Sequence, residues 1–229
     1  MANKFKGIMV PITTPYDKDR NILWNEFENH IEKVLETGVH SLLIPSGTGE
    51  FANFTIDDRV ELTRHAGEII KGRVPLVSMI SDCSTDNVIE IAHRSKEAGA
   101  TEAMLTPPYF TVVGQRAIKN FFLEVADQID MPLWIYHQPG ETKLNVNINT
   151  VMELAKHPNI IGIKVAPAED FMYITRLVRL TKDVDNFSVF NGEDFDLLAS
   201  LLIGADGGVA SLANIIPETF ITMFNAVQA

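Results

Sequence analysis

Hydrophobic and polar positions alternate along the chain in two recurring patterns. Short apolar runs, each bounded by Gly, Pro, Ser, Thr or Asn, are typical of strands that are buried on both faces. Between these runs, apolar residues recur at helical spacing, as Phe27, Ile31 and Val34 do. The predicted strands span 7–12, 41–45, 75–80, 103–105, 132–136, 160–165, 187–190 and 207–210, and the predicted helices span 24–36, 56–70, 87–98, 117–129, 148–156, 171–181, 195–203 and 217–229.

Eight strand–helix units in this order favour an α/β fold, the (β/α)8 barrel. No Ser/Gly-rich or Pro-rich linker interrupts the units, so we expect a single domain over residues 1–229 that ends within the eighth helix. A doubly wound open sheet is the alternative architecture. Against it, no strand-to-helix turn carries a Gly-x-Gly-x-x-Gly fingerprint or a P-loop.

Composition and charge limit which partners the protein could bind and in which cell compartment we expect it. The chain is 46% hydrophobic and 21% charged, which is ordinary for a globular domain. A net charge of -11 argues against nucleic acid and against an anionic membrane surface. The single cysteine, Cys83, and the lack of a signal peptide or a membrane-spanning run favour a cytoplasmic protein. The histidines lack metal-ligand spacing, so we expect no metal site.

Lys164 is the unusual residue among the predicted strand ends, where a barrel of this kind has its active site. It closes the apolar run 160–165, and burial disfavours the charged form of an amine. A neutral amine is the nucleophile that imine chemistry with a carbonyl substrate requires. The alternative is a lysine that extends to water or pairs with Glu50 or Asp194.

Two other strand ends add candidate binding groups. The loop 46–50, Ser-Gly-Thr-Gly-Glu, offers open backbone N–H groups and the Thr48 hydroxyl to a carboxylate or phosphate. Tyr136 ends the strand before that of Lys164, so its phenol could move protons in the same cavity. A simple turn and a core tyrosine are the alternative interpretations.

Taken in order, these segments resemble the dihydrodipicolinate synthase and N-acetylneuraminate lyase family of pyruvate-dependent class I aldolases. The resemblance extends from residue 7 to the end of the chain. It is carried by Val-Pro-Ile-Thr-Thr-Pro-Tyr at 10–16, Gly-Thr-Gly-Glu at 47–50, Pro-Pro-Tyr-Phe at 107–110, Ile-Tyr-His-Gln-Pro-Gly at 135–140, Ile-Gly-Ile-Lys at 161–164 and the segment 204–214.

The resemblance implies a role for several residues. Lys164 would form the Schiff base with pyruvate or another 2-oxo acid, and Tyr136 would shuttle protons beside it. Gly47 and Thr48 would hold the carboxylate, and the Val209 backbone would lie close to it. The covalent imine on Lys164 would need no cofactor. A homo-oligomer, either a dimer or a tetramer, is usual in the family.

Three positions depart from the synthase pattern. Gly47 replaces a threonine of the tyrosine relay, and Phe110, after Tyr109, replaces a tyrosine supplied across a subunit interface. Glu141 stands where the synthases have the arginine that receives a carboxylate of the aldehyde, and an acid there would repel an anion.

The lyase pattern fits better but incompletely. Asp194 and Ser211 match segments that hold sugar hydroxyls, whereas Ala166 and Phe195 replace a threonine and an acid of the lyases. His137 could reach the substrate or could have no catalytic role.

We therefore expect a lyase that cleaves a 2-oxo acid, of sugar-acid type, to pyruvate and an aldehyde or condenses the two. Dihydrodipicolinate synthase, a 2-oxo acid dehydratase and a non-catalytic pyruvate-binding barrel are the alternatives. Family members typically continue through further helices, so we expect Ala229 to end a truncated or partial chain and the helical extension to improve solubility.

Overall fold

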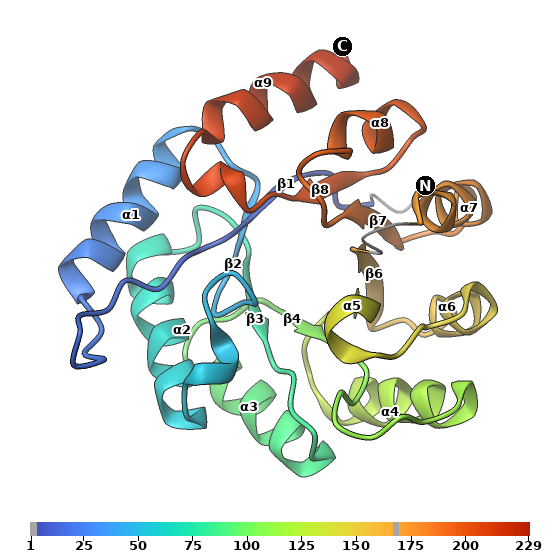
Figure 1. Cartoon of the computed structure of the whole chain (residues 1–229), viewed down its shortest axis with the longest axis horizontal. Coiled ribbons are helices and arrows are strands. Elements are labelled where there is room, and N and C mark those ends of the chain that lie inside the picture. Colours follow the sequence, from blue (N-terminus) through green and yellow to red (C-terminus); the bar gives the residue numbers. More distant parts are fainter. Residues whose placement is uncertain (1–3, 167–169) are drawn as a thin grey trace.

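Eight parallel strands close a barrel in chain order, with β8 paired to β1 (Figure 1). The computed structural model describes residues 4–166 and 170–229. This closure confirms the (β/α)8 prediction and excludes the open sheet. The strands are β1 (Gly7–Pro11), β2 (Ser41–Leu43), β3 (Leu76–Met79), β4 (Glu102–Leu105), β5 (Leu133–His137), β6 (Ile160–Val165), β7 (Ser188–Asn191) and β8 (Gly207–Val209).

The helices form an outer ring, and the last of them, after β8, lies between the first helix and the helix before it (Figure 1). The α-helices are α1 (Trp24–Glu36), α2 (Ile56–Ile70), α3 (Thr85–Glu97), α4 (Gln115–Gln128), α5 (Pro139–Thr142), α6 (Ile148–Leu154), α7 (Phe171–Leu180), α8 (Leu197–Leu202) and α9 (Pro217–Gln228). Two single-turn 3-10 helices are η1 (Phe51–Asn53) and η2 (Leu212–Asn214).

Alternation along each strand separates two apolar layers. In β5, Leu133 and Ile135 pack outward against the helices, whereas Trp134 and Tyr136 pack inside the barrel. Successive strand side chains point to opposite faces, so every second residue of a strand faces the interior. The inner layer is Met9, Leu43, Val77, Met79, Met104, Trp134, Tyr136, Ala166, Phe190 and Val209.

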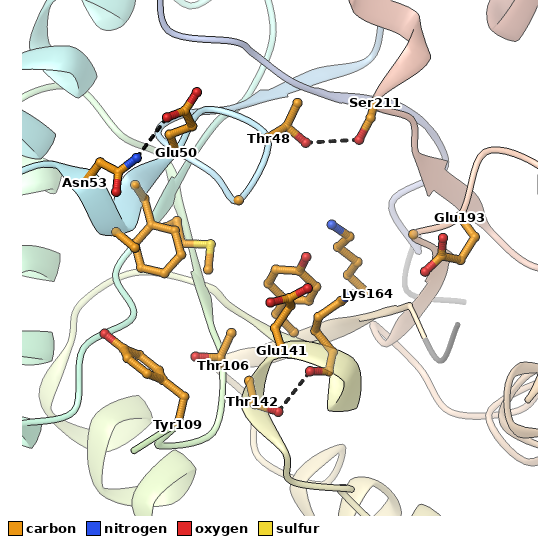
Figure 2. Close-up of a pocket in the computed structure, with 17 residues that line it drawn as sticks. Thr48, Glu50, Asn53, Thr106, Tyr109, Glu141, Thr142, Lys164, Glu193 and Ser211 are labelled. Atoms are coloured by element: carbon orange, nitrogen blue, oxygen red, sulfur yellow. Dashed lines mark hydrogen bonds between the residues drawn. The ribbon is translucent and has the colours of Figure 1, made fainter. Parts of the chain in front are cut away.

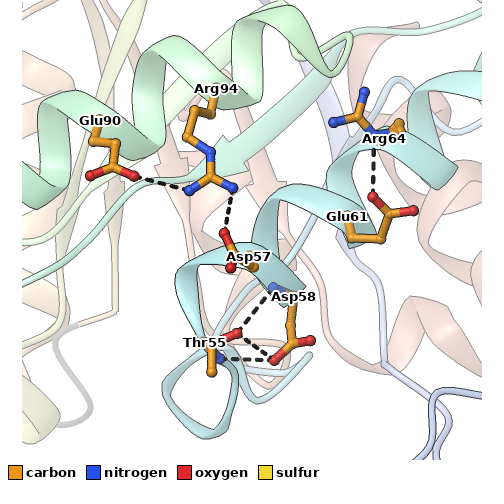
Figure 3. Close-up of polar contacts among 7 residues, drawn as sticks. All are labelled: Thr55, Asp57, Asp58, Glu61, Arg64, Glu90 and Arg94. Carbon is orange, nitrogen blue, oxygen red and sulfur yellow. Dashed lines mark hydrogen bonds and ion pairs between the residues drawn. The ribbon is translucent and has the colours of Figure 1, made fainter.

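Polar contacts fix the start of α2 and join it to α3 (Figure 3). Thr55 accepts a hydrogen bond from the Asp58 backbone N–H, and the Asp58 carboxylate accepts one from the Thr55 N–H, which completes a capping box. Arg94 of α3 donates to Asp57 at 2.5 Å and to Glu90 at 2.9 Å. These contacts hold α2 in place after η1, which itself follows the loop 46–50.

The short elements were not predicted. In α5, Pro139 occupies the first turn and the Thr142 hydroxyl donates to the Gln138 carbonyl oxygen, so one turn forms without any apolar periodicity.

Three predicted helices begin at other residues than expected. Helix α8 begins at Leu197 rather than at 195, and Phe195 is exposed in the preceding loop. Helices α3 and α4 begin two residues before the predicted positions, after Ser84 and Gly114 in extended conformation.

Neither a membrane-spanning helix nor a cluster of metal ligands is present in the described parts of the chain. Over 4–166 and 170–229, no helix has both the length and the apolar character of a membrane span. Within the same ranges, no three His, Cys, Asp or Glu side chains cluster as ligands of a metal ion would.

Candidate active site

A cavity of about 640 Å³ opens at the carboxyl ends of the barrel strands (Figure 2). The loops after β2, β4, β5, β7 and β8 contribute to it, together with side chains of β3, β5 and β6, as expected for this fold. Its polar walls come from residues that are distant in sequence and are brought together by closure of the barrel. The lining residues are Gly47, Thr48, Glu50, Phe51, Ala52, Asn53, Met79, Thr106, Tyr109, Tyr136, Gln138, Glu141, Thr142, Lys164, Gly192, Glu193 and Ser211.

Lys164 and Tyr136 form the centre of the cavity. They are paired across β5 and β6, and the Lys164 Nζ atom lies 4.0 Å from the centroid of the Tyr136 ring. Lys164 is only 6% exposed, and its amine points into the open space between Thr48 and Glu141 (Figure 2). An ammonium group over the face of an aromatic ring is attracted by the ring quadrupole, so this contact favours the charged amine at this position.

The acids considered as ion-pair partners of Lys164 are engaged elsewhere. Glu50 Oε2 accepts hydrogen bonds from the Tyr16 hydroxyl and from Asn53 Nδ2, each at 2.8 Å. Asp194 Oδ2 accepts from the Leu212 backbone N–H at 3.1 Å. The ion pairs found in the described part of the chain all use other cations than Lys164. The amine is therefore directed at the cavity rather than at a structural partner.

Gly192 leaves room for the lysine. A Cβ atom at this position would lie 2.6 Å from Lys164 Cε and 2.9 Å from Ala166 Cβ, closer than real atoms approach. The Gly192 N–H donates to the Val165 carbonyl oxygen at 2.7 Å, which holds the chain against β6. The missing side chain thus allows the β7 loop to lie directly against the lysine.

The loop 46–50 is held tightly against the first strand. A Cβ atom on Gly49 would lie 2.6 Å from the Ile12 carbonyl oxygen, so only glycine fits. The Gly49 N–H donates to Ser46 Oγ at 3.1 Å, and the Thr14 hydroxyl donates to the Gly49 carbonyl oxygen at 2.9 Å. Gly47 lies at the cavity, where its Cβ position is 3.8 Å from the Tyr136 hydroxyl.

Ser211 connects the last strand to this loop. Its Oγ atom lies 3.0 Å from Thr48 Oγ1, within hydrogen-bonding distance, and both residues line the cavity (Figure 2). Asp194 does not line it, and its Oδ2 atom instead accepts a hydrogen bond from the Leu212 backbone N–H. Burial raises the pKa of Asp194, and the nearby backbone N–H groups act in the opposite direction.

Three acidic residues line the cavity: Glu50, Glu141 and Glu193. Glu193 is half-buried, and its burial raises the pKa of the carboxyl group, while the Lys164 charge acts in the opposite direction. Glu141 is exposed on α5, on the opposite side of the Lys164 amine from Thr48 and Ser211 (Figure 2). The acid that departs from the synthase pattern thus lies within the cavity.

The structure brings most of the candidate residues together. Lys164, Tyr136, Gly47, Thr48, Ser211, Tyr109 and Glu141 all line the cavity. Tyr109 lies at its edge, and burial, together with Cys83 and Asp82 nearby, raises the pKa of the Tyr109 phenol to about 12. Their catalytic and binding roles stay predictions.

Four candidates do not reach the cavity wall. Val209 is buried inside the barrel, and Asp194 lies behind the wall. Phe110 is 88% exposed on the loop after β4. His137 ends β5 pointing outward and stacks on Tyr173, with ring centroids 4.3 Å apart. Burial lowers the pKa of His137 to about 4, although the charge of Asp170 acts in the opposite direction.

Several cavity residues had no recognised signal in the sequence. Thr106, Gln138 and Thr142 are ordinary polar residues there, and Met79 is one more apolar strand residue. Glu193 follows the predicted strand 187–190, and this position at a strand end is the only feature of the sequence that indicates the cavity for it. Inward alternation along β3 could have identified Met79, because its neighbour Val77 faces the barrel interior too.

The sequence of this chain is similar to those of known proteins. A family model described as the dihydrodipicolinate synthetase family matches residues 4–229. A 4-hydroxy-tetrahydrodipicolinate synthase of Methanoculleus marisnigri is 33% identical over 227 residues, which cover 98% of this chain and 77% of that protein. An uncharacterized DapA-like lyase of Thermofilum pendens is 32% identical over 231 residues, 100% of this chain and 76% of that one.

A solved structure has the same barrel. YagE, a prophage protein of the dihydrodipicolinic acid synthase family from Escherichia coli K12, was crystallised in complex with pyruvate. It superposes with a TM-score of 0.94 at 25% identity, over 98% of this chain and 76% of that one.

Proposed function

The chain belongs to the dihydrodipicolinate synthetase family and is a lyase of that family, and from this premise we propose that it works through an imine on Lys164. The proposed reaction is reversible cleavage of a 2-oxo acid to pyruvate and an aldehyde. The position of the Lys164 amine carries the proposal: it lies beside the Tyr136 ring and points into the cavity. A nearly buried amine without an acidic partner in the described chain is suited to nucleophilic attack.

The reaction follows from the chemistry of the amine. Lys164 Nζ attacks the C2 carbonyl carbon of the 2-oxo acid, and a C–N bond forms as the carbonyl oxygen takes protons and leaves as water. The protonated imine then accepts the electron pair of the breaking C3–C4 bond, while the C4 hydroxyl loses its proton and the aldehyde leaves. The remaining enamine takes a proton at C3, and hydrolysis releases pyruvate and restores the amine.

Tyr136 and the loop 46–50 supply the remaining functions in this proposal. The Tyr136 phenol is close enough to Lys164 to carry protons to and from the oxygen that leaves or enters. Its hydroxyl lies near Gly47, so the backbone at 47–48 and the Thr48 hydroxyl can hold the pyruvate carboxylate alongside. YagE was crystallised in complex with pyruvate, which supports pyruvate as a ligand of this cavity. The imine is itself the electron sink, so the proposal assigns no cofactor.

The two enzymes act on different aldehydes. The cavity residues near the aldehyde therefore distinguish a lyase for sugar-acid-type substrates from the synthase. Glu141 lines the cavity where the synthase pattern has an arginine for a carboxylate, and Gly47 lacks the relay hydroxyl. Both favour the lyase. The synthase and a 2-oxo acid dehydratase share the imine and are second candidates, and a non-catalytic pyruvate-binding barrel is the least favoured.

Oligomerisation is proposed on one further observation. Phe110 and Val112 are 88% and 76% exposed on the loop beside the cavity, and a partner subunit would cover them. We therefore propose a homo-oligomer, a dimer or a tetramer. Light scattering after gel filtration tests this assembly, and a monomer at micromolar concentration would contradict it.

Borohydride trapping tests the proposed function. The protein is incubated with pyruvate and sodium borohydride, and its intact mass is measured. We expect one covalent adduct on the native chain and on Lys33→Ala, an exposed lysine of α1, and none on Lys164→Ala. Absence of the adduct, or its persistence in Lys164→Ala, would contradict the proposal. Pyruvate release from candidate sugar acids then identifies the lyase.

A further inference from the structure

The Asn214 side chain joins the carboxyl ends of the first and last strands from a position outside the cavity lining. Its amide nitrogen donates hydrogen bonds to the Pro11 carbonyl oxygen at 2.9 Å and to the Ser211 carbonyl oxygen at 2.8 Å. Its amide oxygen accepts from the Thr13 backbone N–H at 3.2 Å and lies 2.8 Å from His30 Nε2. One side chain thereby connects the end of β1, the loop after β8 and helix α1.

These four contacts require an amide at position 214. The two carbonyl oxygens need donors, and the amide nitrogen has two N–H groups for them. The other end must accept, because the Thr13 N–H only donates, and His30 Nε2 therefore carries its proton toward Asn214. Aspartate has the same shape but only acceptor oxygens when ionised, so it would place an oxygen against both carbonyl groups.

Ser211 is held by Asn214 at the point where it reaches the loop 46–50. The Ser211 carbonyl oxygen accepts from the Asn214 backbone N–H at 3.2 Å as well as from the side chain. The Ser211 Oγ atom lies 3.0 Å from Thr48 Oγ1, at the cavity wall (Figure 2). Asn214 thus fixes the backbone of the residue whose hydroxyl meets Thr48.

The direction of the hydrogen bond between these two hydroxyls determines what Thr48 can offer a ligand. Each hydroxyl carries one proton, so a threonine that donates to Ser211 has none left for a carboxylate. When Ser211 donates instead, Thr48 Oγ1 accepts, and its own proton is available to the ligand. Consecutive hydrogen bonds of this kind strengthen one another.

On the basis of the proposed pyruvate pocket, we propose that Asn214 is a positioning residue for pyruvate binding. It holds Ser211 so that the serine hydroxyl donates to Thr48 and the Thr48 hydroxyl donates to the pyruvate carboxylate. The contacts run from Asn214 through Ser211 to Thr48 and do not involve the Lys164 amine. The affinity for pyruvate, rather than the reactivity of the amine, therefore depends on Asn214.

Borohydride trapping over a range of pyruvate concentrations separates affinity from reactivity. Asn214→Ala should raise the pyruvate concentration for half-maximal trapping about fivefold, which is the effect of about one hydrogen bond. The maximal trapping rate should stay close to that of the native chain. Asn214→Asp should raise the half-maximal concentration at least as much, although it keeps the shape of the side chain. An unchanged concentration in both variants would overturn the inference.

A double substitution tests whether Asn214 acts through Ser211. Ser211→Ala should itself raise the half-maximal concentration, whereas Ser211→Thr keeps the hydroxyl and should stay near the native value. In the Ser211→Ala chain, a further Asn214→Ala substitution should add little, because the hydroxyl that it positions is gone. Equal effects of Asn214→Ala in the native and the Ser211→Ala chains would overturn the inference.

His30→Ala is the control for a general loss of stability. It removes the contact between α1 and Asn214 and keeps the contacts of Asn214 with the strand ends. We expect a lower Tm with the native half-maximal concentration of pyruvate. If His30→Ala and Asn214→Ala lower Tm and raise this concentration equally, the effect is one of stability, and the inference is overturned.

The rise in Tm caused by pyruvate keeps this test distinct from the proposed function. If the native chain forms no adduct, the imine proposal fails, and the chains are compared by the pyruvate concentration that gives a fixed rise in Tm. A higher concentration for Asn214→Ala than for the native chain would still support the inference. Equal concentrations, or no rise in Tm with pyruvate, would overturn it.

Discussion

The Tyr136 ring lies 4.0 Å from the Lys164 amine, because the two residues are direct partners across β5 and β6. Both side chains belong to the inward-facing set of their strands, and Phe190 of β7 is the next residue in the same row. Strand register, rather than a flexible loop, therefore sets the distance between the proposed nucleophile and its proton shuttle. A site built on strands keeps this geometry before substrate binds.

Tyr136→Phe should slow formation of the pyruvate adduct by roughly a hundredfold or more, since general acid–base groups contribute about that much. The ring that contacts the lysine remains, so the fold and the amine position should be kept. The rate is measured by quenching with borohydride at successive times.

The matched control is Tyr173→Phe. The Tyr173 hydroxyl donates to the Val146 carbonyl oxygen at 2.5 Å, outside the barrel interior. This control should lower Tm by a few degrees and leave the adduct rate unchanged. Equal rates for Tyr136→Phe and the native chain would exclude a role of the phenol in proton transfer.

The barrel could be predicted because its signal is local and repeated. Each strand is a short apolar run between turn residues, and each long helix has an apolar stripe, so errors at single boundaries leave the order of elements intact. The one-turn helix α5 has no apolar periodicity, so the sequence pattern did not predict it, although it places Glu141 at the cavity.

The site could be predicted only at residues whose type is unusual for their position. Lys164 at the end of an apolar strand is such a case, and so is the glycine-rich loop. Side-chain direction was harder to predict: Asp194 follows Glu193 directly, yet it binds backbone N–H groups while Glu193 faces the cavity. His137 alternates outward because Tyr136 faces inward, which strand periodicity could have indicated.

Gly192→Ala should lower the reactivity of Lys164 more than it lowers the stability of the fold. The new methyl group would meet Lys164 Cε at 2.6 Å and force the flexible end of that side chain to move. Misplacement of a reacting group by about 1 Å can cost roughly a hundredfold in rate. We expect adduct formation to slow by at least tenfold. Tm should also fall by a few degrees, because the new methyl group would meet Ala166 Cβ at 2.9 Å as well.

Gly114→Ala is the control for that substitution, since nothing lies within 4 Å of its Cβ position. It should keep the native adduct rate. If Gly192→Ala forms the adduct as fast as this control does, close packing against the lysine is not needed for its reactivity.

Thr48→Val should weaken pyruvate binding without abolishing the adduct. The substitution keeps the shape of the side chain but removes the hydroxyl that contacts Ser211 Oγ and that is proposed to donate to the carboxylate. Loss of one hydrogen bond costs about 1 kcal/mol, or about fivefold in the pyruvate concentration needed for half-maximal trapping. Thr222→Val, exposed on α9, should show no change, and an equal effect of both would contradict the assignment.

Acid should destabilise the fold through His137. Burial lowers its pKa to about 4 in the folded chain, below the ordinary value of 6.5. Between these values the unfolded chain binds the proton and the folded chain does not, so stability falls as pH decreases from 6.5 to 4. The full difference corresponds to at most about 3 kcal/mol.

His137→Phe isolates this contribution, because it keeps a ring stacked on Tyr173 and removes the titrating group. Buried carboxyl groups such as Glu102 and Asp206 have raised pKa values and act in the opposite direction, so the native curve alone is not diagnostic. Urea unfolding of both chains from pH 4 to pH 7 gives the difference in free energy. We expect the native chain to lose stability relative to His137→Phe as the pH falls, and a difference that stays constant over this range would show that His137 is not buried in its neutral form.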